Sequence, residues 1–165
     1  MYTNYAATIM KRELETLRQE LMAYPNPSDI WALPAGISNS AGTLALHLCG
    51  NLSHFVGSIL GGNGYVRERD AEFADRDVPL EMLLGKIDET IEAVTTSLES
   101  MADQALENSP NFDFGKWSPA APDFLIHLVS HLAFHLGQVN YHRRLITGQR
   151  GEVSVLEIPR LRTAS

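Results

Sequence analysis

The sequence contains a single cysteine, and it has no long apolar run and no leader-like beginning. Cys49 has no partner for an internal disulfide, so a disulfide-stabilised scaffold is excluded and a reducing compartment is expected. Glycine, serine, asparagine and histidine interrupt every apolar stretch before it reaches the length of a membrane span. The start of the chain lacks the basic and apolar regions of a secretory signal. We therefore expect a cytoplasmic protein that does not interact with a membrane.

Positive charge is scarce as well. The chain has 13 Lys and Arg residues against 20 Asp and Glu residues, which gives a net charge of −7. A nucleic-acid backbone would be repelled by this excess of negative charge, so nucleic acid is not an expected partner. With 165 residues, 44% of them hydrophobic, the chain is long enough to form one domain with its own core, covering residues 1–165.

Hydrophobic periodicity predicts four helices and no strand. The four expected helices cover approximately residues 2–24, 41–60, 79–101 and 122–147. Residues 109–121 are rich in proline, asparagine, serine and glycine, which indicates a long crossover or loop before the last helix. An irregular tail is expected after Gly151. Because four helices of similar length can cover one another's apolar faces, the sequence predicts an all-α fold, a four-helix bundle.

Charge is also scarce in two of the predicted helices. No Asp, Glu, Lys or Arg lies between Asp29 and Arg67, and no Asp or Glu lies between Asp123 and Glu152. All the histidines of the chain fall within these two stretches: His47, His54, His127, His131, His135 and His142. A helical wheel of residues 124–146 places His131, His135 and His142 at the centre of the apolar face, so we expect them to be buried. Buried imidazole is costly without a partner, and a metal ion is a common one.

The spacing of three histidines predicts a metal site. His131 and His135 are four residues apart, so their rings can converge on one ion from one helix face. His47, on a facing helix, would complete a three-histidine site that leaves a position open for water or substrate. Imidazole ligands suit zinc, nickel, copper or iron(II) better than magnesium or calcium. The missing carboxylates argue against a di-iron carboxylate bundle and against the His-Glu-x-x-His pattern of metalloproteases.

Three further polar residues are expected near this site. Asn51 and Gln138 could orient a substrate or a bound water, or they could simply bond to each other. His54 lies two helical turns from His47, too far to share the ion, and is assigned to the surrounding pocket. No carboxylate is in obvious reach of the site, so a general base is not assigned.

The loop after the second predicted helix allows two interpretations. Tyr65 and Arg67, with Arg69 and Asp70, could contact an anionic thiol cofactor, or they could form a solvated loop held by its own salt bridges. His127 and His142 flank the metal pair and are interpreted as structural. Cys49 lies on the far side of its helix from His47 and is expected to be a small core side chain.

Two segments carry a resemblance to a known family. His47-Leu48-Cys49-Gly50-Asn51-Leu52 and His131-Leu132-Ala133-Phe134-His135-Leu136-Gly137-Gln138, followed by Gly148, resemble the DinB-like family. The resemblance implies a four-helix bundle with a divalent metal on His47, His131 and His135. Characterised members include transferases and isomerases that use low-molecular-weight thiols, and dimers are common among them. A homodimer is therefore expected.

These observations lead to two functional hypotheses. The first is a metal-dependent enzyme, with zinc or nickel as the expected metal, that activates a thiol or water at the open position. Its partners would be a small-molecule thiol or electrophile, and its reaction would be that of a thiol transferase or a hydrolase. The alternative is a non-catalytic helical bundle that binds a metal or a small ligand.

Overall fold

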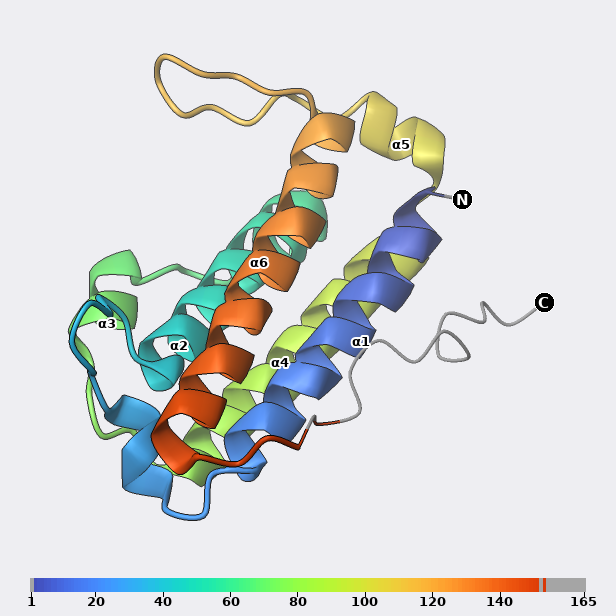
Figure 1. Cartoon of the computed structure of the whole chain (residues 1–165). Helices are drawn as coiled ribbons and strands as arrows, with labels where there is room; N and C mark the ends of the chain where they lie inside the picture. Colours follow the sequence, from blue (N-terminus) through green and yellow to red (C-terminus); the bar gives the residue numbers. More distant parts are fainter. Residues whose placement is uncertain (1, 152, 154–165) are drawn as a thin grey trace.

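The computed structural model describes residues 2–151 and 153, and all regular secondary structure in that part of the chain is helical. Four long helical segments dominate the molecule (Figure 1). They are α1 (Tyr2–Met22), α2 (Ala41–Leu52) with its continuation η2 (Ser53–Leu60), α4 (Leu80–Glu99) and α6 (Ala121–Thr147). Three short pieces lie in the connections: η1 (Pro27–Trp31), α3 (Arg69–Ala74) and α5 (Asp103–Glu107). The all-α prediction is confirmed, whereas the short pieces were not predicted. The expected irregular tail lies almost wholly outside the described residues.

Local chemistry explains where the helices begin and end. The Ser40 side chain accepts a hydrogen bond from the backbone N–H of Thr43 at 3.1 Å and so caps the start of α2. Gly148 ends α6 with a φ of 69°, in the left-handed region where glycine is favoured. The last turns of the second long helix are wider than an α-helix, since the N–H of Gly61 donates to the carbonyl of Val56, five residues back, at 2.9 Å. Such π-type turns occur often at functional sites.

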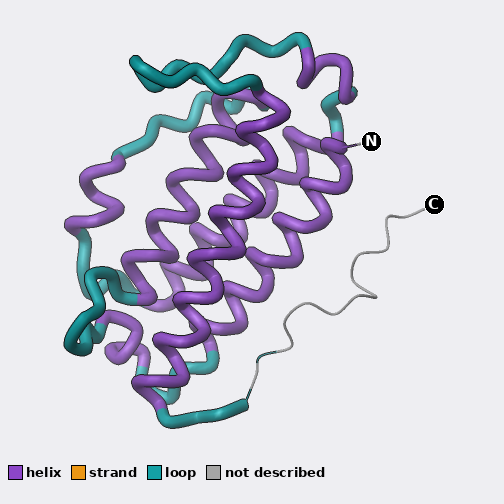
Figure 2. The backbone as a smooth tube through the Cα atoms, turned by 45° about the horizontal axis from the view of Figure 1, so that its top comes forward, coloured by secondary structure: helices purple, strands orange, loops and turns teal. Residues whose placement is uncertain are grey.

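The four long segments pack with α1 and α2 at opposite corners, each of them in contact with both α4 and α6 (Figure 2). α2 and α4 run in the same direction. Ser53 and Thr90 share a hydrogen bond between their hydroxyls at 3.2 Å, and eight residues further on Gly61 lies directly against Ser97. α1 and α6 run the opposite way (Figure 1).

This arrangement places the crossover earlier in the chain than the sequence indicated. Because α2 and α4 are parallel, residues 61–79 must return along the length of the molecule, and they carry α3 past the outer side of α2 (Figure 1). Residues 100–120, with α5, stay at one end of the molecule. The segment before the last helix is therefore a loop and not a crossover.

The uncharged second helix is the most enclosed one. Every residue of α2 is buried, because η1, α3, α4 and α6 all contact it. The combined helix Ala41–Leu60 is long and apolar enough to cross a membrane, but 78% of its most apolar window is buried inside the protein. A core helix of a soluble protein has this property.

A buried ion pair connects α1 to α6 on the opposite side of the molecule. Glu20 and Arg143 are 0% and 1% exposed, and the Arg143 guanidinium Nε donates to Oε2 of Glu20. The side-chain amide of Asn140 donates to the other carboxylate oxygen at 2.7 Å. With both oxygens bonded, the buried charge of Glu20 is compensated.

Candidate metal centre

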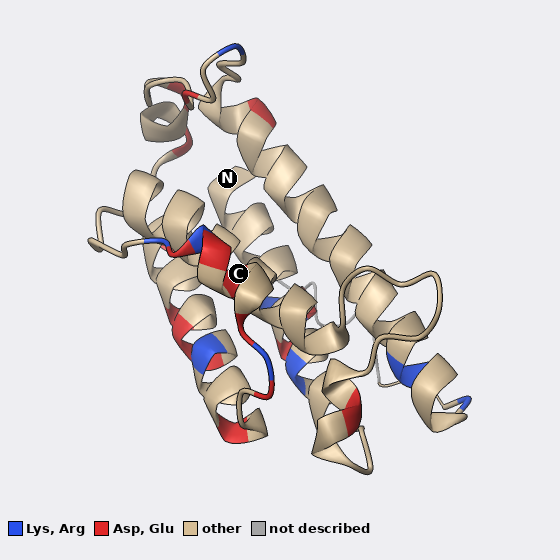
Figure 3. Ribbon diagram, turned by 90° about the vertical axis from the view of Figure 1, so that its left-hand side faces the viewer, with Lys and Arg blue, Asp and Glu red and all other residues tan. Residues whose placement is uncertain are grey.

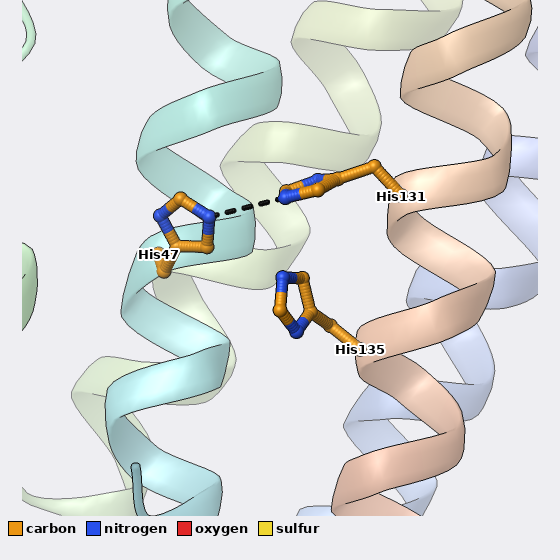
Figure 4. A group of neighbouring side chains, drawn as sticks. All are labelled: His47, His131 and His135. Carbon is orange, nitrogen blue, oxygen red and sulfur yellow. Dashed lines mark hydrogen bonds between the residues drawn. The ribbon is translucent and has the colours of Figure 1, made fainter. Parts of the chain in front are cut away.

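Three histidines from two helices converge in the structure. Figure 4 shows His47 on α2 facing His131 and His135 on α6. One ring nitrogen from each residue lies within 4.8 Å of the other two. The Nε2 atoms of His47 and His131 are 3.3 Å apart. Nitrogens bound to one tetrahedral ion at about 2.0–2.1 Å are separated by about 3.3–3.4 Å, so this pair is already at the spacing that a metal requires.

The trio lies at the edge of the buried face of α6, which corrects the expectation that it would lie at the centre. His131 and His135 are only half-buried, and His127, one turn before them, is exposed. The centre of the buried face is formed by Leu125, Leu132 and Leu136. The helical wheel predicted the wrong centre for the buried face of α6 because it counted the histidines as core residues. Their position toward α2 leaves the site accessible from solvent.

Hydrogen bonds fix the protonation pattern of two of the three rings. The Nδ1 atom of His47 is 3.0 Å from Oε2 of Glu72, and the Nδ1 atom of His135 is 2.7 Å from Oε1 of Gln138. An ionised carboxylate and an amide oxygen only accept, so each Nδ1 carries the proton and donates it. The Nε2 atoms of these two rings therefore carry no proton, as a metal ligand requires.

The third ring has an unsatisfied atom. Nδ1 of His131 is buried and has no hydrogen-bond partner among the described residues. Burial, together with repulsion from the nearby rings of His135 and His47, lowers the pKa of His131 to about 4. Burial likewise lowers the pKa of His135. The hydrogen bond that His135 donates to Gln138 raises this pKa, and repulsion from His47 lowers it, so the pKa stays below its ordinary value. Both rings are therefore neutral at pH 7, which is the form that binds a metal.

Glu72 is the site residue that sequence reasoning missed. It lies on α3 and is buried, at 6% exposure. Arg67 donates to both of its carboxylate oxygens, from Nε at 2.6 Å and from Nη2 at 2.8 Å. Burial alone would raise the pKa of Glu72, but the hydrogen bonds from Arg67 and His47 outweigh it and hold the pKa below its usual value. The expectation that no carboxylate is within reach of the site is therefore wrong.

Two neighbours place Glu72 against His47. A Cβ atom on Gly50 would lie 2.1 Å from Oε1 of Glu72, so only glycine leaves room for the carboxylate against α2. The ring of Phe73 lies against the ring of His47, with 4.9 Å between the centroids. Two neighbouring residues of α3 thus hold His47, one by a hydrogen bond and the other by an aromatic contact.

The remaining predicted residues fall into two groups. Asn51 on α2 and His54 on η2 lie beyond His47. The atoms Oδ1 of Asn51 and Nδ1 of His54 are buried without a hydrogen-bond partner among the described residues. Gln138 is bonded to His135, so the interpretation in which Asn51 and Gln138 bond to each other is not what the structure has.

Tyr65 and Arg67, from the crossover, behave differently. Tyr65 is partly exposed and lines a cavity of about 220 Å³ between α2, α4 and the crossover, which Glu72 also lines. The Arg67 side chain is only 11% exposed and is paired with Glu72. The crossover is therefore held by its own salt bridge, as one of the two interpretations expected, but that salt bridge is buried and not solvated.

Two further expectations can be compared directly with the structure. His142 is buried, with Nδ1 2.7 Å from the hydroxyl of Tyr24 and Nε2 2.9 Å from the carbonyl of Ala32, so it has the structural role expected of it. Cys49 is buried in the core, and burial raises the pKa of its thiol to about 12. A thiol with this pKa is a poor nucleophile at neutral pH.

A groove of about 500 Å³ is lined in part by Gln138, the hydrogen-bond partner of His135. Its walls come from the connection before α2, from the first turn of α2 and from the last turns of α6, and they carry no charged side chain. The lining residues are Gly36, Ile37, Ser38, Asn39, Leu44, Gln138, Tyr141, His142 and Leu145. A neutral organic group would fit such a groove better than an ion.

The donor set suits a transition metal. Three neutral imidazoles provide nitrogen ligands of intermediate softness. Sequence similarity adds a family but no activity. Neither a curated protein nor a solved structure has a significant match to this chain, and no named family supports the DinB-like resemblance. The chain belongs to the family described as "Protein of unknown function (DUF1572)", whose sequence model matches residues 3–162.

Proposed function

We propose that this protein is a divalent-metal-dependent enzyme whose His47, His131 and His135 bind a transition metal, zinc or nickel, and leave a position open for a substrate thiol or water. The scaffold would be a single-domain four-helix bundle in the cytoplasm. The observation that supports the proposal best is the convergence of three ring nitrogens within 4.8 Å, with two rings held in the ligand tautomer by Glu72 and Gln138.

A bound divalent ion would supply the positive charge that brings the pKa of water or of a thiol close to neutrality. The protein would hold the ligands and the substrate in position. Glu72, anchored by Arg67, would keep the Nε2 lone pair of His47 directed at the ion. The buried, unpartnered oxygen of Asn51 and nitrogen of His54 would accept hydrogen bonds from the substrate or from a water beside it.

The electrophile would enter from the uncharged groove next to Gln138. A neutral organic electrophile would leave water on entering this groove and would meet the activated thiol or water at the trio. We accordingly propose a thiol transferase or a hydrolase that acts on small, largely apolar molecules.

One observation favours a second candidate, a non-catalytic protein that binds a metal or a small ligand. Both oxygens of Glu72 are already bonded, to His47 and to Arg67, so this carboxylate is not free to accept a proton from a nucleophile. A site that only binds its ligand needs no general base.

Metal analysis of the purified protein tests the shared part of both candidates. After reconstitution with zinc or nickel and removal of excess metal, the wild type should retain one ion per chain, and His135→Ala should retain much less. His127→Ala is the matched control, because it removes an exposed histidine of the same helix. A wild type that retains no metal would refute both candidates that require one.

A second measurement separates the enzyme from the binding protein. The metal-loaded wild type is assayed with a panel of low-molecular-weight thiols and an apolar electrophile, and separately with hydrolysable esters. Turnover that is lost in His135→Ala and kept in His127→Ala supports the enzyme. No turnover with any thiol or ester, from a protein that holds its metal, favours the non-catalytic candidate.

A further inference from the structure

The groove lined by Gln138 has the size and the charge of a site for a small neutral molecule. Its volume of about 500 Å³ lies within the range of about 300–1,000 Å³ that small-molecule sites occupy. Its walls come mainly from two stretches of sequence without Asp, Glu, Lys or Arg, residues 30–66 and 124–142. Figure 3 shows the second stretch as the part of α6 without blue or red between its acidic first turn and its basic last turns. A charged ligand would leave water here without gaining an opposite charge, so the groove favours a neutral one.

The side-chain amide of Gln138 has its oxygen engaged and its nitrogen free. Oε1 accepts the hydrogen bond from Nδ1 of His135 at 2.7 Å, so the amide cannot turn over without losing that bond. The NH2 group at the other end carries two donors and has no hydrogen-bond partner among the described residues. Because Gln138 is exposed and lines the groove, these donors are the end of the amide that a ligand in the groove can reach.

The other polar side chains of the groove do not restrict the ligand in this way. Both ring nitrogens of His142 are engaged, Nδ1 with the hydroxyl of Tyr24 at 2.7 Å and Nε2 with the carbonyl of Ala32 at 2.9 Å. The remaining polar lining residues carry hydroxyl or amide groups that can turn either to donate or to accept: Ser38, Asn39 and Tyr141. Gln138 therefore offers the groove a free hydrogen-bonding position whose direction is fixed from within the protein.

We infer that Gln138 determines the specificity of this groove, and that the ligand it selects is a neutral organic molecule with an acceptor oxygen, such as the carbonyl group of a ketone, ester or amide. The carbonyl oxygen accepts a hydrogen bond from the amide nitrogen of Gln138. The apolar remainder of the ligand lies against Ile37, Leu44 and Leu145. An analogue that offers only an N–H group at this position would bring one donor against another, and this loss of a hydrogen bond lowers its affinity.

This inference names a substrate class for the proposed function, and it rests on that function where it calls the ligand a substrate. One end of the Gln138 amide bonds to His135 and the other end bonds to the ligand, so a single side chain joins the groove to the histidine trio. The electrophiles that carry such an oxygen are esters, for the hydrolase, and alkenes activated by a carbonyl group, for the thiol transferase. The preference for an acceptor oxygen itself follows from the hydrogen bond to His135 and requires neither a metal nor turnover.

Two bicyclic probes of similar size test the inference on the full-length protein, with a chelator present so that metal plays no part. Indanone has a carbonyl oxygen that only accepts hydrogen bonds, whereas indole has an N–H group that only donates. In proton–nitrogen correlation NMR spectra, indanone should shift the side-chain NH2 signals of Gln138. Indole should bind about 3- to 10-fold more weakly than indanone, which is the net contribution of one hydrogen bond.

Gln138→Glu reverses the preference of the groove while keeping the contact with His135. One carboxylate oxygen can still accept from Nδ1 of His135, but the group at the other end is now an acceptor. The affinity for indanone should fall about 3- to 10-fold and the affinity for indole should rise, whereas general damage to the groove would lower both. Gln104→Glu is the matched control, because it makes the same change at an exposed residue of α5 outside the groove and should alter neither affinity.

Three results would overturn the inference: no binding of indanone at millimolar concentration, binding that leaves the NH2 signals of Gln138 unshifted, or the same preference in the wild type and in Gln138→Glu. Circular dichroism establishes that the variant is folded, which is expected because Gln138 is exposed. If it did not fold, the NH2 signals of the wild type would still decide. Zinc retention and turnover are measured separately, so a protein that binds indanone at Gln138 but retains no metal would contradict the proposed function and not this inference.

Discussion

The Nδ1 atom of His47 lies 3.0 Å from Oε2 of Glu72, twenty-five residues later in the chain, and both side chains are buried. This contact connects a helix of the core to a short helix on the crossover. It also decides which nitrogen of His47 is available to a metal, because the carboxylate can only accept the hydrogen bond.

Replacing Glu72 tests this connection. Glu72→Gln preserves the shape of the side chain but removes the charge that pairs with Arg67 and makes the amide able to donate. His47 should then lose its fixed tautomer, and zinc affinity should fall about 10- to 100-fold. Isothermal titration calorimetry of the metal-free protein measures the change. Glu68→Gln, on the same crossover but exposed, is the control. An unchanged dissociation constant for Glu72→Gln would show that the contact does not act on the metal.

Gly50→Ala disturbs the same contact without altering any polar group. The added Cβ would lie 2.1 Å from Oε1 of Glu72, so the carboxylate must move away from α2. We expect a loss of about 1–3 kcal/mol in the free energy of unfolding, together with weaker zinc binding. Urea unfolding and calorimetry measure the two effects.

Gly85→Ala is the matched control for this substitution, because Gly85 is also helical and a Cβ there has no atom within 4 Å. It should be neutral or stabilising by up to about 1 kcal/mol, with zinc binding unchanged. Equal effects of the two substitutions would mean that the crowding at Glu72 is not the cause.

The lowered pKa of His131 predicts how stability depends on pH. Between about pH 4 and the ordinary value of 6.5, the unfolded chain binds a proton at this position and the folded chain does not. The free energy of unfolding of the metal-free protein should therefore fall as the pH drops through this window. His135, whose pKa is also lowered, contributes in the same direction.

Urea unfolding at pH 7.5, 6.0 and 5.0, in the presence of a chelator, measures this dependence. His131→Phe should flatten the curve, because it removes the group that gains a proton on unfolding. His127→Ala provides the comparison, since it removes an exposed histidine one turn away. A curve for His131→Phe as steep as that of the wild type would assign the pH dependence to other groups.

The Glu20–Arg143 pair predicts a large effect on stability outside the His47, His131 and His135 trio. Arg143→Met removes one partner and leaves the Glu20 carboxylate buried, bonded only to Asn140. We expect a loss of about 3–5 kcal/mol, measured by urea unfolding at pH 7. The double variant Glu20→Gln/Arg143→Met should recover much of this loss, because no buried charge remains. If the double variant were no more stable than Arg143→Met, the cost would not be electrostatic.

The sequence predicts the core helices well because their signals are local. The apolar periodicity of α4, the Ser40 cap and the Gly148 stop each act within a few residues. The trio could also be predicted from the sequence, since the four-residue spacing of His131 and His135 fixes their relative position on one helix. Assigning His47 to the same site required only the assumption that the two helices poor in charge face each other.

The remaining features depend on contacts that no local pattern encodes. Glu72 belongs to a polar segment whose composition resembles any solvated loop, and its burial follows from the crossover passing along α2. The parallel direction of α2 and α4 is likewise a property of the whole fold. The nearest sequence signal was Gly50 inside an otherwise well-formed helix, whose missing side chain makes room for that carboxylate.

The residues of the site stand on two kinds of structure, which differ in how readily their sequence can change. The trio stands on helices whose mutual packing is fixed by the core, whereas the residue that orients His47 stands on a surface connection. Surface connections tolerate changes of length and sequence that packed helices do not. Proteins of this architecture can therefore retain the same three histidines while exchanging the group that tunes them, which gives evolution a way to vary reactivity without rebuilding the core.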